Sequence, residues 1–324
     1  MNGITYRPYR GSKELAGMAA ANARLRTRLG LLEPIDLAAM EHRYTHLVNS
    51  DPLTDCLVAE RDEVTVGYAR TEWHDLTDGD RVYDITAVVE PGAWGLGIGD
   101  ALFAWSEARL RVIARTLPTD RRCWFAIYAY DGDEETIPAL LARGYTAVRW
   151  DAEMLRADLL DLPEVVVPDG YTLRAPSEGE LSAVFDMMVS AFAEHWGEYQ
   201  AEDQRLDDWL EDPRFHRDLV VVAWHGDRPA SVVGNVLESR PDGTVRGLLD
   251  AVATHPDHRR RGLARAAIAE SLRRLRDSGA ASAYLGVDTD NHNRALALYE
   301  SCGFQVATRS ATYRKLFEPG DDRR

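Results

Sequence analysis

Residues 252–264 of the chain read Val252-Ala253-Thr254-His255-Pro256-Asp257-His258-Arg259-Arg260-Arg261-Gly262-Leu263-Ala264. The apolar start of this stretch predicts a strand, and the arginines and glycine predict a turn. An amphipathic helix is expected to follow the turn, because apolar residues recur at helical spacing at Leu263, Ala267, Ile268, Leu272 and Leu275. This order is typical of an anion site, since the first amides of a helix have no backbone partner.

The residue types in the turn favour a phosphate as the anion. Arg259, Arg260 and Arg261 raise the local positive potential, and a guanidinium can donate two hydrogen bonds to phosphate oxygens. Gly262 and the small Ala264 let a pyrophosphate approach the backbone closely. We therefore expect the turn to bind phosphate.

A second informative stretch follows the predicted helix. It reads Val287-Asp288-Thr289-Asp290-Asn291 and then Ala295-Leu296-Ala297-Leu298-Tyr299-Glu300-Ser301-Cys302-Gly303-Phe304. The first part predicts a strand, and the second predicts a short helix that ends at a glycine.

Together the two stretches resemble the GNAT superfamily of acyl-CoA N-acyltransferases. The family's phosphate loop reads Arg/Gln-x-x-Gly-x-Gly/Ala, and residues 259–264 match it. A later family segment reads Asn-x-x-x-Ala-x-x-Leu-Tyr-x-x-x-Gly-Phe, and it is matched by Asn291, Ala295, Leu298, Tyr299, Gly303 and Phe304. The resemblance implies an α+β fold, with a mixed, mostly antiparallel sheet flanked by helices, and acetyl-CoA as the acyl donor.

The same order of elements is predicted twice. In the first half a strand at 82–89 precedes the glycine turn Gly95-Leu96-Gly97-Ile98-Gly99 and a helix at 100–114, and Gly144-Tyr145 corresponds to Gly303-Phe304. Antiparallel strands are expected upstream of each turn, at 56–59, 64–68, 219–224 and 230–233. We therefore expect tandem GNAT domains, a degenerate one at residues 1–162 and a catalytic one at residues 163–324.

The resemblance assigns roles in acetyl transfer to the second half. The pantetheine arm and thioester carbonyl would lie along Val252 to Thr254, where backbone N–H groups stabilise the developing oxyanion. Tyr299 would protonate the departing thiolate, since a phenol with a pKa near 10 can do so. The alternative for Tyr299 is a packing role in the last helix.

The base that accepts the proton of the amine is less well defined by the sequence. Asp250 is the first candidate, because residues two apart on a strand, such as Asp250 and Val252, face the same way. Its alternative is a strand-capping or arginine-pairing role. Glu238 and His255 are weaker candidates.

Three further residues are candidates for ligand contact. Glu194 and His195 lie in an acidic and aromatic patch where the family builds its acceptor site, although the patch is equally typical of a solvated loop anchored by Trp196. Asn291 matches the position that braces the CoA-proximal strand, or it caps the following helix.

The first half departs from the family pattern at two positions. Trp94 stands where arginine or glutamine is expected, and Leu140, at the position of Tyr299, cannot donate a proton. We expect a domain without catalysis, either a scaffold or a second CoA site formed by Gly95, Gly97 and Gly99.

Composition limits the function classes. A chain of 324 residues suggests two domains, and no apolar run is long enough to span a membrane. The three cysteines are too few and too scattered for a disulfide framework, so we expect a cytoplasmic protein. A net charge of −15 argues against nucleic acid and favours a small-molecule amine as acceptor. Oligomeric state is left open.

Other functions fit the sequence less well. Residues 95–99 lack the third glycine of a dinucleotide-binding fingerprint, because position 100 is aspartate. No metal is expected, because the cysteines are isolated and His42 and His46, though four residues apart, lack a glutamate at the metalloprotease position. The remaining alternatives are a non-catalytic CoA-binding or interaction module and a protein N-acetyltransferase.

Overall fold

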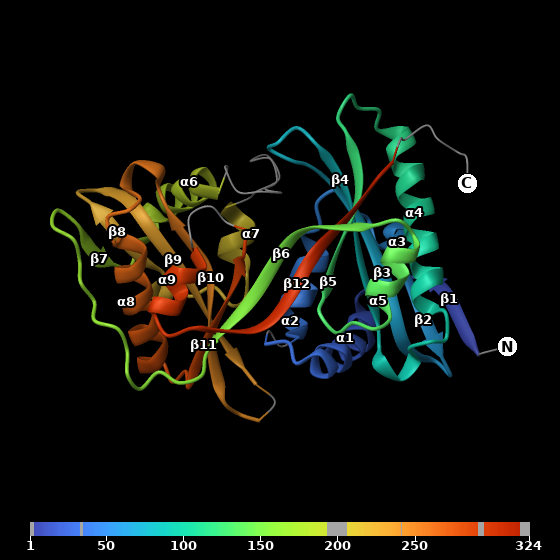
Figure 1. Cartoon of the computed structure of the whole chain (residues 1–324), viewed down its shortest axis with the longest axis horizontal. Coiled ribbons are helices and arrows are strands. Elements are labelled where there is room, and N and C mark those ends of the chain that lie inside the picture. Colours follow the sequence, from blue (N-terminus) through green and yellow to red (C-terminus); the bar gives the residue numbers. More distant parts are fainter. Residues whose placement is uncertain (1–2, 33–34, 193–205, 241, 291–294, 318–324) are drawn as a thin grey trace. The chain divides into compact units, whose positions relative to one another are not determined.

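The computed structural model describes residues 3–32, 35–192, 206–240, 242–290 and 295–317. It divides into two compact units, one of Met1–Trp150 with Arg309–Arg324 and one of Asp151–Thr308 (Figure 1). In each unit helices cover both faces of a mixed sheet, which confirms the predicted α+β class.

The first unit has the strand order β1-β2-β3-β4-β5-β12. Among the described residues its neighbouring strands are antiparallel, apart from the parallel pair β4 and β5. Its strands are β1 (Ile4–Pro8), β2 (Cys56–Arg61), β3 (Val64–Asp75), β4 (Arg81–Val89), β5 (Cys123–Tyr130) and β12 (Gln305–Leu316). Its helices are η1 (Ser12–Glu14), α1 (Leu15–Leu29), α2 (Leu37–Thr45), α3 (Pro52–Asp55), η2 (Pro91–Ala93), α4 (Ile98–Thr116) and α5 (Thr136–Ala142).

Helices α1 and α4 cover opposite faces of this sheet. Cys56 and Val58 of β2 pack with α1, whereas Leu57 and Ala59 pack with α4. The alternation follows from the two-residue period of a strand.

The second unit has the strand order β6-β11-β10-β9-β8-β7, with β10 and β11 parallel. Its strands are β6 (Thr146–Arg156), β7 (Thr172–Arg174), β8 (Val221–His225), β9 (Arg228–Ser239), β10 (Val245–Thr254) and β11 (Ser282–Asp288). Its helices are η3 (Glu178–Glu180), α6 (Leu181–Phe192), α7 (Leu206–Glu211), η5 (Arg217–Leu219), η6 (Pro256–His258), α8 (Leu263–Asp277) and α9 (Ala295–Ser301).

Helices α6 and α8 cover the two faces of the second sheet. Val222 and Val232 pack with α6, and their neighbours Val221 and Val233 pack with α8. The architecture of the first unit is thus repeated.

The last strand of each sequence half pairs outside its own half. Asp151 to Arg156 of β6 pair antiparallel with β11 of the second unit, and Ser310 to Leu316 of β12 pair with β5 of the first. The division predicted between residues 162 and 163 follows the sequence repeat, whereas the compact units exchange these strands. Local sequence patterns do not identify a strand's partner, which is why the exchange was not predicted.

Strand β10 carries two irregularities that shape the site. Its parallel pairing with β11 ends at Leu248, although β10 continues to Thr254. Its pairing with β9 shifts register between Leu249 and Ala251, which leaves Asp250 as a bulge. Leu249 and Val252 therefore pack against one core cluster although they lie three residues apart. The expectation that Asp250 and Val252 share a face is wrong, because the bulge shifts the alternation by one residue.

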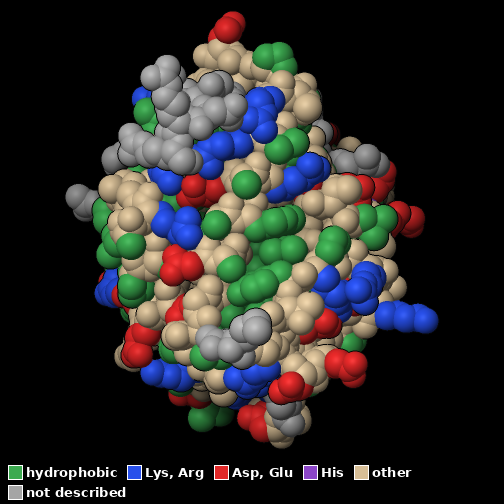
Figure 2. Space-filling view, turned by 90° about the vertical axis from the view of Figure 1, so that its right-hand side faces the viewer, with side chains coloured by type: hydrophobic (Ala, Val, Ile, Leu, Met, Phe, Trp, Pro, Cys, Tyr) green, Lys and Arg blue, Asp and Glu red, His purple; other side chains and the backbone are tan. Residues whose placement is uncertain are grey.

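The surface mixes both signs of charge with apolar groups. Figure 2 shows one face, where apolar side chains gather in the centre between arginine or lysine and acidic side chains. Within the described residues no helix has the length and apolar character needed to cross a membrane. The three cysteines are buried and form no disulfide.

We predict that Gly247→Ala destabilises the protein by about 1–3 kcal/mol, because it overpacks the core. A β-carbon at this position would lie 2.6 Å from Cδ1 of Leu275, which is fully buried on α8. Chemical unfolding measures the effect, and Gly286→Ala on β11 is the matched control, since a β-carbon there meets nothing within 4 Å. Equal stability of the two variants would contradict this packing.

Candidate functional site

The predicted phosphate loop connects β10 to α8. After η6 the backbone adopts positive φ at Arg260 (63°) and at Gly262 (86°), and α8 begins at Leu263. Leu263 is 2% exposed and packs with Ala223 and Ala230, which fixes the start of the helix. No side chain of the N-cap residue, Gly262, covers the first amides of α8, so they can donate to an anion.

The three arginines of the loop have different environments. Arg259 turns inward, where its Nε donates to the carbonyl of Thr254 at 3.2 Å and its Nη2 to that of Ala191 at 3.3 Å. Arg260 and Arg261 are exposed, although Arg261 also reaches the carbonyl of Asp257 at 3.3 Å. Arg259 thus braces the loop, and the other two provide its positive surface.

The strand before the loop has one edge without a strand partner. Beyond Leu248 the described residues of β10 have no β11 partner, while Val252 and Thr254 still pair with β9. Thr254 is held further, because its Oγ1 lies 2.8 Å from Oγ of Ser231. A ligand can therefore lie along β10 and make backbone hydrogen bonds like a missing strand.

Tyr299 lies on α9, the helix that follows β11. Its side chain is 7% exposed and belongs to the core cluster against which Val252 packs. Burial, with the nearby Cys302 thiol, raises the pKa of Tyr299 to about 12. The phenol therefore carries its proton at neutral pH, as a proton donor must.

The candidate base Asp250 is exposed and lies beside a cationic side chain. Burial by itself would lower the pKa of Arg214, but its hydrogen bond to Asp212 and the charges of Asp250 and Glu238 raise it above its ordinary value. Arg214 is therefore a fixed positive charge next to the carboxylate of Asp250.

The two weaker base candidates make internal hydrogen bonds. Glu238 is buried, and its Oε2 accepts from the hydroxyl of Tyr284 at 2.8 Å. Nδ1 of His255 accepts from the amide of Asp257 at 3.3 Å and so caps η6. Glu194, His195 and Asn291 lie outside the described residues.

The first half repeats the loop with one exchanged side chain. Gly95 and Gly97 have positive φ of 74° and 77°, as Arg260 and Gly262 do. Trp94 Nε1 donates to the carbonyl of Val89 at 3.0 Å, the counterpart of the bond from Arg259 to Thr254. Trp94 therefore departs from the family pattern, as predicted, but keeps the hydrogen bond that braces the loop. The sequence pattern did not indicate that this bond would be kept.

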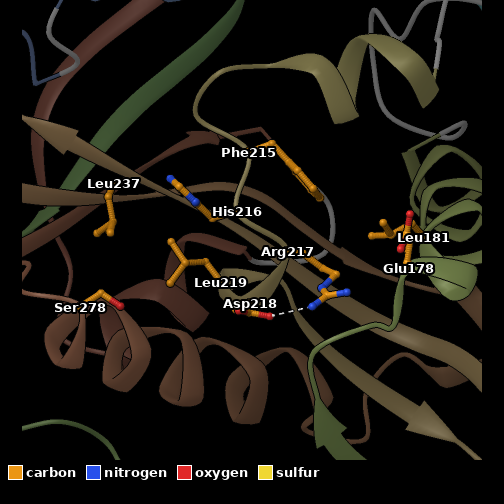
Figure 3. A pocket seen from close by; sticks show the side chains of 9 residues that line it. All are labelled: Glu178, Leu181, Phe215, His216, Arg217, Asp218, Leu219, Leu237 and Ser278. Atoms are coloured by element: carbon orange, nitrogen blue, oxygen red, sulfur yellow. Dashed lines mark ion pairs between the residues drawn. The ribbon is translucent and has the colours of Figure 1, made fainter.

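An open pocket of about 510 Å³ in the second unit is separate from this loop (Figure 3). Its lining includes Phe215, His216 and Ser278, and Arg217 and Asp218 form an ion pair at 3.5 Å within it. Ser278 follows the C-terminal end of α8, whereas the phosphate loop precedes its first residue. The helix separates the two places by roughly 22 Å, so the pocket is not the predicted phosphate site.

Aromatic side chains gather where η6 enters the loop. The hydroxyl of Tyr171 lies 2.8 Å from Nδ1 of His258, whose ring is 5.4 Å from that of His225 and 5.7 Å from that of His255. Burial, followed by the neighbouring His225, Arg261 and His255, lowers the pKa of His258, while Asp257 opposes this. Within the described residues no cluster of metal-binding side chains is found.

The chain matches known acetyltransferases in sequence and in fold. The model of the acetyltransferase (GNAT) family matches residues 19–116 and 181–304. A mycothiol acetyltransferase of Frankia alni is 33% identical over 70% of this chain and 68% of its own length. A second, from Actinosynnema mirum, is 31% identical over 76% of this chain and 79% of its own.

Two solved structures share the whole fold. A GCN5-related N-acetyltransferase from Sphaerobacter thermophilus has a TM-score of 0.73 at 19% identity and covers 99% of this chain and 98% of its own. A tandem GNAT protein from the clavulanic acid biosynthesis pathway has a TM-score of 0.70 at 17% identity, with coverage of 98% and 100%.

We predict that His258 makes the protein less stable in acid. Because its pKa is lower in the folded state, the unfolded chain binds more protons, and this contribution to stability is lost as the pH falls below the ordinary value of 6.5. His258→Asn places an oxygen acceptor near Nδ1, so its melting temperature should fall less between about pH 7 and 5.5 than that of the wild type. His42→Asn on α2 is the control, and an unchanged pH profile for His258→Asn would contradict the assignment.

Proposed function

Because the chain belongs to the GNAT family of acetyltransferases, we propose that it moves an acetyl group from acetyl-CoA to the primary amine of a small molecule, with the chemistry in its second half. The observation that carries this proposal is the end of parallel pairing at Leu248. From that point β10 leads into the phosphate loop, and β11 leads into the helix that carries Tyr299.

The donor would bind along these elements. Its pyrophosphate would accept from the first amides of α8 and face Arg260 and Arg261, while Arg259 holds the loop. Its pantetheine arm would pair with the backbone of Val252 and Thr254, and an N–H of the same edge would stabilise the carbonyl oxygen as it gains charge. Leu263 and Ala264 shape the helix start, and Asn291 is proposed to brace the end of the strand beside the donor.

The reaction would proceed by direct attack on the thioester. The amine nitrogen, once deprotonated, forms a bond to the carbonyl carbon, and the carbon–sulfur bond breaks. We assign the amine proton to Asp250 and the proton that the thiolate receives to Tyr299. The bulge turns Asp250 away from the face of Val252, so a water between base and amine fits this geometry better than direct contact.

The acceptor is assigned by charge and by relatives. An acidic chain attracts a cationic amine, and the matched relatives are named mycothiol acetyltransferases, which favours a small molecule over a protein N-terminus or a non-catalytic role. Glu194 and His195 remain proposed acceptor contacts.

The function is tested by release of CoA thiol from acetyl-CoA with a panel of small primary amines that includes the acceptor of the mycothiol acetyltransferases. We expect turnover with at least one small amine and none in Gly262→Asp, which places a negative charge in the phosphate loop. Acetyl-CoA binding without turnover on any amine or protein acceptor would favour the non-catalytic alternative.

We predict that Tyr299→Phe lowers kcat by a factor of about 10² to 10⁴ without lowering stability or acetyl-CoA affinity. The ring keeps its place in the core and its contact with Phe304, while the proton for the thiolate is lost. Single-turnover kinetics and calorimetry measure these quantities. An unchanged kcat would leave Tyr299 only its packing role.

We also predict that Asp250→Asn lowers kcat and removes the acidic limb of the pH–rate profile, because the amide cannot accept the proton. Asp242→Asn is a matched control in the turn before β10, where the carboxylate accepts hydrogen bonds from Thr244 and pairs with Arg240 at 3.3 Å. An unchanged pH–rate profile for Asp250→Asn would contradict its role as the base and leave it only the role of pairing with Arg214.

A further inference from the structure

The phosphate loop of the first half already holds an anion from the chain itself. The amide of Gly95 donates to Oε2 of Glu135 at 2.9 Å, and the amide of Gly99 donates to Oε1 at 3.4 Å. A β-carbon at Gly99 would lie 3.1 Å from Oε1, so the carboxylate sits directly against the start of α4.

This place is suited to a carboxylate. Gly97 caps α4 without a side chain, and the backbone turns through positive φ at Gly95 and Gly97, which exposes successive amides. Such amides, at the positive end of a helix of 19 residues, attract negative charge. Glu135 satisfies amides that a phosphate would otherwise take.

The segment that carries Glu135 is held in position. The buried Asp133 accepts from the amide of Glu135 at 3.1 Å and from that of Thr136 at 2.8 Å. Glu135 therefore enters the loop from a fixed turn before α5.

The corresponding position in the second half has the opposite charge. Helices α5 and α9 have the same length, and the ninth residue before Gly144 is Glu135, whereas the ninth before Gly303 is Arg294. Arg294 lies outside the described residues, so this comparison is one of sequence alone.

We propose that Glu135 is a built-in anion that closes the phosphate loop of the first half, so that the chain takes up one acyl-CoA and not two. Uptake in the second half rests on the proposed function. A pyrophosphate entering the first loop would have to displace the carboxylate and would meet its charge. Glu135 thus replaces the ligand structurally and excludes it electrostatically.

Titration calorimetry with CoA tests the proposal in a Gly262→Asp background, where the second loop is blocked. We expect one site per chain in the wild type and none in Gly262→Asp. Adding Glu135→Gln removes the charge at equal size, and adding Glu135→Arg installs the residue of the second half. Either change should create one site that binds CoA at least tenfold more tightly than Gly262→Asp alone. Adding Gly97→Asp should abolish the new site and so locate it.

Glu134→Gln is the matched control, because it removes the same charge from the adjacent residue, which is 72% exposed and pairs with Arg28. It should create no site. The proposal is overturned if Gly262→Asp alone still binds one CoA, or if the folded Glu135 variants bind none. If the wild type binds no CoA, the proposed role of the second loop is contradicted. In that case, a gain of CoA binding in Glu135→Arg would still support the role of Glu135.

Discussion

Backbone amides left without a strand or helix partner are the constraint on which both halves depend. In the second unit parallel pairing ends at Leu248, and in the first the pairing of β4 with β5 ends at Ile85. In each half the strand then leads into a loop and a helix, and the first amides of that helix have no intrahelical acceptor. The two halves satisfy this shared requirement differently. The second presents its amides beside two exposed arginines, whereas the first supplies the carboxylate of Glu135.

The loops show which contacts a duplicated fold retains when its chemistry diverges. The bond that ties the loop to the preceding strand is made by the guanidinium of Arg259 in one half and by the indole of Trp94 in the other. By contrast, Tyr299 is replaced by the fully buried Leu140. The brace is needed wherever the loop must hold its shape. Leu140 keeps the packing position but has no proton to donate.

The exchanged strands make each sheet depend on both sequence halves. Because β6 completes the sheet of the second unit and β12 that of the first, neither sequence half contains all the strands of a sheet. An excised half would expose an unpaired edge at β5 or β11, and such edges favour aggregation. Each sequence half therefore depends on the other to complete its sheet.

The sequence alone determined much of this protein. The glycine and arginine turn and the tyrosine segment carried the resemblance to the GNAT family, which implied the α+β class. The loop at 259–264 and the repeated order of elements followed from local pattern and spacing. Tertiary structure decided three further features. The bulge that turns Asp250 away from Val252 depends on the register with β9, and the strand exchange depends on pairing between distant segments. The carboxylate of Glu135 reaches the amide of Gly95 across 40 residues of chain, and spacing along a sequence does not encode such a contact.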